Sequence, residues 1–439
     1  MTLLDILIAN VTAVTMNERM DVLFGAFIGI KDGKIAHIGK EAPKEPPKTI
    51  VDGTGMVAMP GLINCHTHLA DTALRSYLDD VPRNEALEKR LAREDKLDSR
   101  SAKASALLAL AECIRCGTTS VSDLYYYPDA TAEAAKEVGI KANVALSAYR
   151  FIDENEEFDF DTDEQCKELC RITEKYQDDP QIRVDAGIYA EYTSNHRLWD
   201  ALSSFALEKN LGFQLHLAES KEESEGCMDR TGLAPGELLA CHGIFREGAC
   251  ATGCGALTDE EFALLGKKKL SAVFTPIANA KLGLPLLPVA KAVKAGINVA
   301  LGTGGASESG NLDMFEVMRA TALTQRVTGG DAGAMPAAAV LMMATVCGAR
   351  AQGRADRIGM LKEDMDADLI LVDFTKPHLL PCHNVLSALV FSAKGSDVAL
   401  TMAGGKILYK NGEYTTLQLD KAVEEVKEYA IGRLFDEKG

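Results

Sequence analysis

The sequence predicts an α/β protein, a (β/α)8 TIM barrel with a small β-sandwich domain built from both termini. Two observations lead to this prediction. First, the middle of the 439-residue chain alternates apolar strands with helical stretches, and eight such units are the signature of the barrel. Second, both ends of the chain consist of strands and tight turns, with hairpin signals at Asp32-Gly33 and Asn411-Gly412.

The predicted domain boundaries follow from these patterns. Residues 1–55 and 363–420 are expected to form the composite β-sandwich, and residues 56–362 the barrel. Residues 421–439 are expected to form a closing helix. In a (β/α)8 barrel the functional residues lie at the carboxyl ends of the strands, so the search for a site begins there.

Each barrel strand is predicted from an apolar run that a helical stretch follows. One helix start is marked by Thr258 and Glu261, which form a capping box ahead of an apolar helix. The eight runs, in chain order, are GLINCHTH, TTSVSDLY, KANVALSAY, RVDAGIYAEY, GFQLHLAES, ACATGCGAL, LSAVFTP and INVALGT.

The charge balance and the cysteines narrow the classes of partner. The chain has 64 acidic and 47 basic residues, a net charge of −17, whereas nucleic acids and anionic membranes require a concentrated basic face. The segment MTLLDILIANVTAV lacks the basic start of a signal peptide, and no apolar run reaches the roughly 20 residues of a membrane span. Eleven scattered cysteines indicate reduced thiols and a cytoplasmic protein. The expected partner is a small-molecule substrate or ligand, and a homo-oligomer is left open.

Histidines at two strand ends predict a metal site. His66 and His68 end the first barrel strand, and because strand side chains alternate, both point into the mouth of the barrel. His216 ends the fifth strand at the matching height. Three imidazoles with open coordination positions are typical of one catalytic zinc, with iron or manganese as alternatives. Without the third histidine, the first pair would fit hydrogen-bonded polar side chains equally well.

Glu219 follows His216 by three residues and is the candidate catalytic acid or base. A carboxylate at this place could exchange a proton with a water at the metal. The other interpretation is a carboxylate at a helix N-terminus, stabilised by the helix dipole.

Several longer strings occur in order along nearly the whole chain. They are PGLINCHTHL, IRCGTTSVSD, QLHLAES, LTDEEFALL, NLDMFEVMRATAL, GRADRIGMLKEDMDADLILVD and HNVLSALVFSAKGSDV. These strings resemble the amidohydrolase superfamily, in the branch of adenosylhomocysteine/methylthioadenosine deaminases and triazine chlorohydrolases. The resemblance implies the barrel and the terminal β-sandwich. It also implies one divalent metal held by the HxH pair, a fifth-strand histidine and an eighth-strand aspartate, of which the histidines correspond to His66, His68 and His216.

The resemblance breaks at polar positions of the site while the surrounding strings remain. The expected aspartate falls at Gly304, in the turn GTGGA, and the expected sixth-strand histidine falls at Gly253. A seventh-strand histidine is replaced by Phe274. On the fourth strand a substrate-contacting histidine becomes Tyr189, and Glu191 stands where proline is usual. Because the scaffold strings are intact, this pattern indicates a repurposed pocket.

The lost groups bear on the chemistry. In the family mechanism the aspartate binds the metal and takes a proton from the attacking water, and losing a general base costs about 10²–10⁴-fold in rate. Ordinary deamination by that mechanism is therefore not expected. Glu308, in the same turn, and Glu191, on the same predicted face as Tyr189, are candidates for a replacement carboxylate. The residues expected to contact the substrate are Tyr189, Glu191, Phe274, Gly304 and Glu308.

Three functions are compatible with these features. The first is a metal-dependent hydrolase that acts on a carbon–nitrogen (non-peptide) or similar bond of a small cyclic or heteroaromatic compound. The second is a catalytically inactive relative that binds a ligand or serves as a partner subunit. The third is a metal-free site in which backbone N–H groups of GTGGASESGN bind a phosphate or carboxylate.

Overall fold

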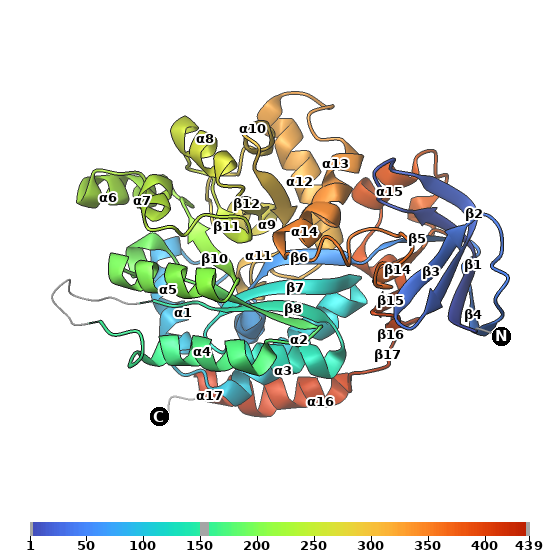
Figure 1. Cartoon of the computed structure of the whole chain (residues 1–439), viewed down its shortest axis with the longest axis horizontal. Helices are drawn as coiled ribbons and strands as arrows, with labels where there is room; N and C mark the ends of the chain where they lie inside the picture. The colour runs from blue at the N-terminus through green and yellow to red at the C-terminus, as the bar shows by residue number, and fades with distance from the viewer. Residues whose placement is uncertain (1–2, 150–157, 436–439) are drawn as a thin grey trace.

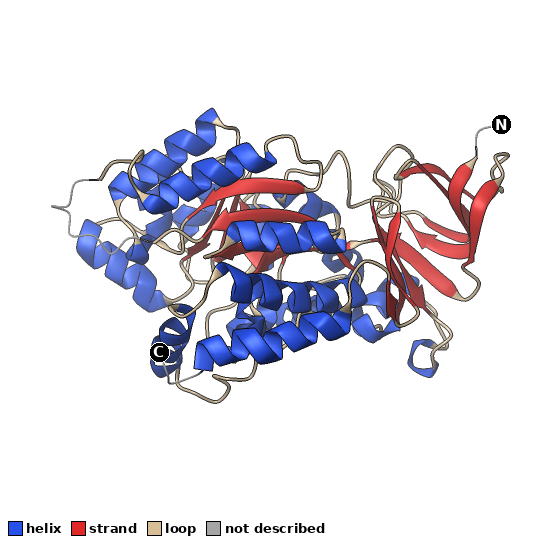
Figure 2. Ribbon diagram, turned by 90° about the horizontal axis from the view of Figure 1, so that it is seen from below, coloured by secondary structure: helices blue, strands red, loops and turns tan. Residues whose placement is uncertain are grey.

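The computed structural model describes residues 3–149 and 158–435, which form two regions (Figure 1). One region is a barrel whose eight strands, counted over the described residues, are all parallel to their neighbours. The other is a sheet that joins strands from both ends of the chain. Figure 2 shows helices surrounding the barrel strands, with the second sheet lying apart at the end that carries the N-terminus. The predicted fold class is confirmed.

The barrel strands follow one another in space in the order of the sequence. Each of the eight predicted runs forms one of them within the described part of the chain. Their residues are buried almost without exception, because helices cover the outer face and side chains fill the interior, which is why these strands are continuous apolar runs. The strands are β6 (Leu62–Thr67), β7 (Thr118–Tyr125), β8 (Lys141–Leu146), β9 (Ile182–Gly187), β10 (Gly212–Leu217), β11 (Ala249–Gly253), β12 (Ser271–Phe274) and β13 (Asn298–Leu301).

Side-chain and backbone hydrogen bonds connect the first and last barrel strands. Asn64 of β6 donates to the hydroxyl of Thr303 (2.8 Å) and accepts from its backbone N–H (3.0 Å). The N–H of Gly304 donates to the carbonyl of His66 (3.0 Å). This connection places the turn after β13 directly beside the strand that carries the first histidine.

The barrel helices begin at residues that satisfy their free N–H groups. Asp98, Asn195 and Ser220 each accept a hydrogen bond from the first turn of the helix that follows. Thr258 and Glu261 form the predicted capping box. The helices are α1 (Arg83–Glu94), α2 (Ser99–Arg115), α3 (Pro128–Val138), α4 (Glu164–Tyr176), α5 (His196–Glu208), α6 (Lys221–Thr231), α7 (Pro235–Cys241), α8 (Asp259–Lys267), α9 (Pro276–Lys281), α10 (Val289–Lys294), α11 (Ala306–Ser309), α12 (Met314–Gly329), α13 (Ala337–Met343) and α14 (Val346–Ala351).

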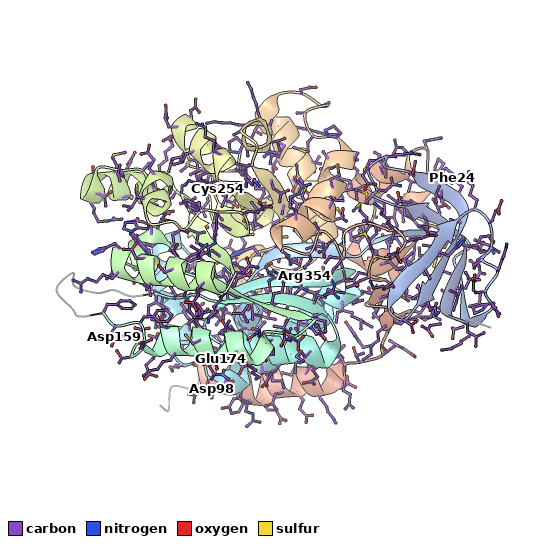
Figure 3. All side chains as sticks on the ribbon, in the orientation of Figure 1. Phe24, Asp98, Asp159, Glu174, Cys254 and Arg354 are labelled. Atoms are coloured by element: carbon purple, nitrogen blue, oxygen red, sulfur yellow. The ribbon has the colours of Figure 1, made fainter. Side chains whose placement is uncertain are left out.

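Polar side chains that follow α14 fill the lower end of the barrel. Gln352 is buried and donates to the hydroxyl of Ser122 (3.0 Å). Arg354, labelled among the barrel strands in Figure 3, donates to the side chain of Asn143 (3.1 Å) and to two backbone carbonyls. Burial lowers the pKa of Arg354 to about 10. Since this end is filled, a ligand site belongs at the opposite end, where the strands finish.

The second sheet has nine strands among the described residues, in the order β17-β16-β15-β14-β5-β1-β2-β3, with β4 also paired to β1. It covers an apolar core of its own, formed by side chains such as Ile8, Ile28 and Leu371. Its strands are β1 (Leu4–Val14), β2 (Val22–Lys31), β3 (Lys34–Gly39), β4 (Pro47–Asp52), β5 (Met56–Pro60), β14 (Leu369–Asp373), β15 (Val398–Ala403), β16 (Lys406–Lys410) and β17 (Glu413–Tyr414).

The strands differ in two places from the expected domain boundaries. Met56–Pro60, expected in the barrel, is strand β5 of the second sheet and pairs with β1 and β14. The barrel therefore begins at Leu62. Within the expected sandwich segment 363–420, helix α15 (Val385–Phe391) instead packs on α12 and α13 of the barrel. An apolar run does not reveal which sheet it joins, because pairing depends on residues distant in sequence.

The C-terminal helix packs along α2, as Figure 1 shows below the barrel. It comprises α16 (Leu419–Glu425), a π-helical turn (Val426–Ala430) and α17 (Ile431–Phe435), so it begins two residues before the expected position, and residues 436–439 lie outside the described part. All eleven cysteines of the sequence lie in the described part of the chain, and no disulfide joins them. No described helix has the length and apolar character needed to cross a membrane.

Candidate metal centre

The three predicted histidines meet at the mouth of the barrel. His66 lies on β6, His68 directly after it, and His216 on β10. The ring centroids are 4.7 Å apart for the first pair, 4.8 Å for His66 and His216, and 5.4 Å for the remaining pair. All three side chains are buried, and one ligand nitrogen from each lies within 4.8 Å of the others. The sequence therefore placed these three side chains together correctly.

The hydrogen bonds of the imidazoles leave their Nε2 atoms free. The Nδ1 of His68 lies 2.8 Å from the carbonyl of Leu124, which can only accept, so this nitrogen carries the proton. The Nδ1 of His216 lies 2.9 Å from a carboxylate oxygen of Glu219. The Nε2 atoms of His66 and His216 are buried without a hydrogen-bond partner among the described residues. Buried polar atoms are rarely left unpaired, and two that face the same space fit a cation.

The protonation of two of the three histidines also suits a metal, whereas Glu219 outweighs burial and raises the pKa of His216. Burial, reinforced by the two neighbouring imidazoles, lowers the pKa of His66 well below its usual value. Burial likewise lowers the pKa of His68 to about 4, although Glu308 acts in the opposite direction. Both rings are therefore neutral at physiological pH, and the neutral imidazole is the form that binds zinc.

Glu219 faces the histidines rather than the helix that follows. Helix α6 begins after Ser220, and the carboxylate of Glu223 accepts the backbone N–H groups of Ala218 and Glu219 (2.9 and 2.7 Å). The interpretation of Glu219 as a carboxylate held by the helix N-terminus is wrong, because Glu223 fills that role. One oxygen of Glu219 bonds His216, and the other has no hydrogen bond to a described residue.

Gly253, at the end of β11, leaves the space that Glu219 uses. Its φ of +93° lies in the region that favours glycine. A Cβ atom at Gly253 would lie 2.6 Å from the Cγ of Glu219 and 3.1 Å from the carbonyl oxygen of Leu217. A side chain at position 253 is therefore incompatible with Glu219 in its observed place, so the missing sixth-strand histidine and the position of Glu219 are linked.

The turn after β13 brings a second carboxylate to the histidines. Gly304 has a φ of +72°, and a Cβ atom there would lie 3.2 Å from an oxygen, Oε2, of Glu308. The same oxygen lies 3.9 Å from the Nε2 of His68, and the other oxygen of Glu308 accepts a hydrogen bond from Arg90. Burial opposes ionisation, but the guanidinium of Arg90, which is charged at physiological pH, acts against burial and helps to keep the pKa of Glu308 below its usual value.

Tyr189 forms one wall of the site. It follows β9, and its ring stacks on that of His216 with centroids 4.8 Å apart. The backbone supports this contact, because the N–H of His216 donates to the carbonyl of Tyr189 (2.8 Å). The hydroxyl of Tyr189 accepts a hydrogen bond from Arg90 (3.2 Å).

A cavity of about 360 Å³ opens above the histidines, a size that suits a small molecule. A neighbouring cavity of about 970 Å³ shares Arg90, Tyr189 and Tyr192 with it and is rich in tyrosine. Arg90 was missed in the sequence analysis because it lies on α1 outside any recognised motif. The first cavity is lined among others by His66, His216, Glu219, Tyr189, Thr252, Gly304 and Glu308.

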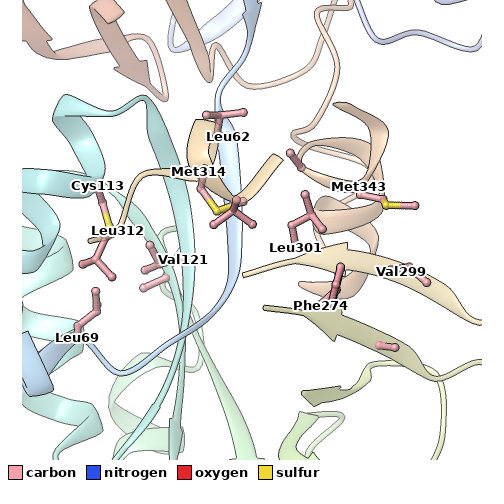
Figure 4. Close-up of a cluster of buried hydrophobic side chains, with 14 of the residues drawn as sticks. Leu62, Leu69, Cys113, Val121, Phe274, Val299, Leu301, Leu312, Met314 and Met343 are labelled. Carbon is pink, nitrogen blue, oxygen red and sulfur yellow. The ribbon is translucent and has the colours of Figure 1, made fainter. Parts of the chain in front are cut away.

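Two residues expected to contact the substrate lie elsewhere. Phe274 is fully buried in the apolar layer with Val299, Leu301 and Met343 (Figure 4). Its strand neighbour Val273 pairs in register with Thr252, which lines the cavity, so alternation turns Phe274 to the outer face. The expected substrate contact of Phe274 is therefore wrong.

Glu191 also lies away from the cavity. The strand β9 ends at Gly187, and residues 191–193 form a 3-10 turn, so the alternation assumed from Tyr189 does not continue. Both carboxylate oxygens of Glu191 accept hydrogen bonds from Arg230 of α6 (2.8 Å each). Glu191 is thus a buried ion-pair partner and does not supply a carboxylate to the histidines.

The glycine-rich turn is not arranged to bind an anion. The N–H of Ala306 and the hydroxyl of Ser307 already donate to Asp71 (2.8 and 2.7 Å). The N–H of Gly305 faces Glu308 (3.4 Å). Because two carboxylates of the chain itself occupy these donors, a phosphate or carboxylate would meet like charge. The anion-binding alternative loses its support.

Comparisons with known proteins agree with this geometry. The model of the amidohydrolase family matches residues 57–408. A 5'-deoxyadenosine deaminase of Methanosarcina acetivorans is 36% identical over 426 residues, which cover 96% of this chain and 97% of that protein. A 5-methylthioadenosine/S-adenosylhomocysteine deaminase of Thermoanaerobacter pseudethanolicus is 35% identical, over 97% and 99% of the two chains. The crystal structure of an adenosine deaminase from Xanthomonas campestris with bound zinc superposes with a TM-score of 0.91, 28% identity and coverage of 97% of each chain. The chain belongs to the amidohydrolase family.

Proposed function

We propose that the chain is a metal-dependent hydrolase that removes an amino group from a small heteroaromatic compound by hydrolysis of a carbon–nitrogen bond. The observation that carries this proposal is the convergence of three buried imidazoles, two of them with an unpaired Nε2, beside the carboxylate of Glu219. The relatives support the type of substrate, because two proteins 36% and 35% identical to this chain are named as deaminases of adenosine derivatives.

His66, His68 and His216 would hold one divalent ion, with zinc as the first choice because the similar adenosine deaminase structure contains zinc. An ion held by three imidazoles acts as a Lewis acid and lowers the pKa of water to about 7. Glu219 orients His216 through its Nδ1 and keeps one oxygen free of other described residues. We assign to that oxygen the transfer of a proton from the attacking water to the leaving nitrogen.

The walls of the cavity suit a flat, polar ring. Tyr189 offers an aromatic surface beside the histidines, and Arg90 holds its hydroxyl. Asn279 and Thr252 add hydrogen-bonding groups to the lining, and Leu282 adds an apolar surface. Hydrogen-bonding groups on an otherwise enclosed surface are what discriminates an amino-substituted heterocycle from an apolar compound of the same size.

The experiment begins with elemental analysis of gently purified protein, followed by assays of ammonia release from 5'-deoxyadenosine, methylthioadenosine and adenosylhomocysteine. We expect close to one zinc, iron or manganese per chain, and loss of that metal in His216→Ala. The matched control is Trp199→Phe, on α5, which should retain the metal. A wild-type protein that binds no metal after reconstitution, or a His216→Ala variant with unchanged metal content, would contradict the proposal.

The inactive relative remains the second candidate, because Gly304 and Gly253 stand where the family has catalytic side chains. It predicts a protein that binds metal and ligand without releasing ammonia. Turnover of any amino-substituted purine at a rate abolished by His216→Ala would exclude this candidate. Tight binding of such a compound, measured by calorimetry, without turnover would favour it over the hydrolase.

A further inference from the structure

We infer that Glu308 supplies the carboxylate that the turn lacks at position 304, as the fourth protein ligand of the metal, with Arg90 holding it in place. The inference rests on the proposed function, since it assumes a metal on the three histidines. Of the two replacement carboxylates that the sequence suggested, it selects Glu308, and it assigns to Arg90 a role that the sequence did not suggest.

The first support is the position of the carboxylate. Glu308 lies on the single-turn helix α11, and its side chain turns back toward the start of that helix, where the N–H of Gly305 faces its Oε2 (3.4 Å). The same oxygen lies 3.2 Å from where a Cβ of residue 304 would be. Glu308 therefore reaches the space that an aspartate at position 304 would fill.

The second support is the direction in which Oε2, the oxygen that Arg90 does not engage, faces. Oε2 of Glu308 lies 3.9 Å from the Nε2 of His68, the nitrogen that carries the lone pair. The N–H of Gly304 bonds to the carbonyl of His66, so the turn cannot move away from the histidine strand without losing that bond. The carboxylate is thus held against the same space that the imidazoles face.

The third support is the contrast between the ion pairs of two carboxylates of this chain. Both oxygens of Glu191 accept hydrogen bonds from Arg230, whose side chain is half exposed. Glu308 gives Oε1 to Arg90, while its Oε2 accepts a long hydrogen bond from the N–H of Gly305 (3.4 Å) and lies 3.9 Å from the Nε2 of His68. Arg90 is also bonded to the hydroxyl of Tyr189, which fixes the guanidinium and hence the carboxylate.

The fourth support is charge. A divalent ion on three neutral imidazoles keeps its full charge in a buried site, where an uncompensated charge is costly. Glu308 is mostly buried, with 14% of its side chain exposed, and it forms an ion pair with Arg90. Since Arg90 engages one oxygen only, the other can offset the charge of the ion. A side chain at position 304 would displace the carboxylate of Glu308, so the observed position of Glu308 depends on the glycine at position 304.

The test is the metal affinity of Glu308→Gln, measured by competition with a chelator, together with the visible absorption spectrum of the cobalt-substituted protein. Glutamine retains the size and a hydrogen-bonding oxygen but removes the charge. We expect at least about a 10-fold loss of zinc affinity and an altered cobalt spectrum, since changes outside the ligand set already cost 10–100-fold. The matched control is Glu191→Gln, which removes the charge from another carboxylate that pairs with an arginine and should leave both readouts unchanged. Unchanged affinity and spectrum in Glu308→Gln would overturn the inference.

A second variant tests the replacement directly. Glu308→Ala should lose metal affinity, and adding Gly304→Asp to it should restore much of that affinity, because aspartate is tolerated at positive φ and Glu308 no longer fills the space. A double variant that binds metal no better than Glu308→Ala would overturn the assignment of Glu308 as a stand-in for residue 304. If the wild-type protein binds no metal, the proposed function fails. If it binds one ion and Glu308→Gln binds it equally well, only the present inference fails.

Discussion

Substitution of Gly253 by alanine tests whether Glu219 needs the empty space at the end of β11. The backbone of Gly253 has a φ of +93°, and the added Cβ would lie 2.6 Å from the Cγ of Glu219. Carbon atoms pack best at about 3.5–4.0 Å, so the two atoms would overlap by about 1 Å. Glu219 must then rotate away and lose its hydrogen bond to His216.

The structure sets the expected size of the effect. A side chain in the left-handed region costs roughly 1–2 kcal/mol. A hydrogen bond to a charged group contributes about 1.5–3 kcal/mol. We therefore expect Gly253→Ala to lower the free energy of unfolding by about 2.5–5 kcal/mol. Displacing the proton carrier should also lower the rate of ammonia release by about 10²–10⁴-fold.

The assay compares the unfolding transition in denaturant, the metal content and the rate with those of Gly232→Ala. Gly232 also has a positive φ, +75°, but a Cβ there would meet nothing within 4 Å, so this control carries the backbone cost alone. Metal content should stay near that of the wild type in both variants, because all three histidines remain. The reasoning is refuted if Gly253→Ala is no less stable than Gly232→Ala and equally active as the wild type.

Two further substitutions distinguish Glu219, which has a proposed catalytic role, from Phe274, which has a packing role. Glu219→Gln keeps a hydrogen bond to His216 but cannot take a proton, so the rate of ammonia release should fall by about 10²–10⁴-fold with the metal content unchanged; a retained rate would assign the proton transfer to another group. Phe274→Ala removes a fully buried ring and should lower the free energy of unfolding by about 3–5 kcal/mol, with the metal bound as before. Loss of the metal while the fold stays intact would show that Phe274 contributes to the metal site.

The sequence by itself determined the barrel, its strand order and the three histidines. Alternation along a strand is a local property, so His66 and His216 could be placed at the barrel mouth once their strands were recognised. The glycines at positions 253 and 304 could also be recognised as departures from the family pattern, because they interrupt motifs that are otherwise intact. Each of these inferences needs only residues that are near one another in the chain.

The tertiary structure alone decided what fills the space that those departures leave. Glu191 is removed from the site because β9 ends at Gly187, and Phe274 because register with Thr252 turns it outward. Arg90 comes from a helix more than two hundred residues before Glu308, and their contact has no sequence signal. The strand Met56–Pro60 joins the second sheet because it pairs with β14, which lies far away in the sequence. Partners that are distant in the sequence are brought together only by the folded chain, so side-chain pairing across the site is a property of the fold.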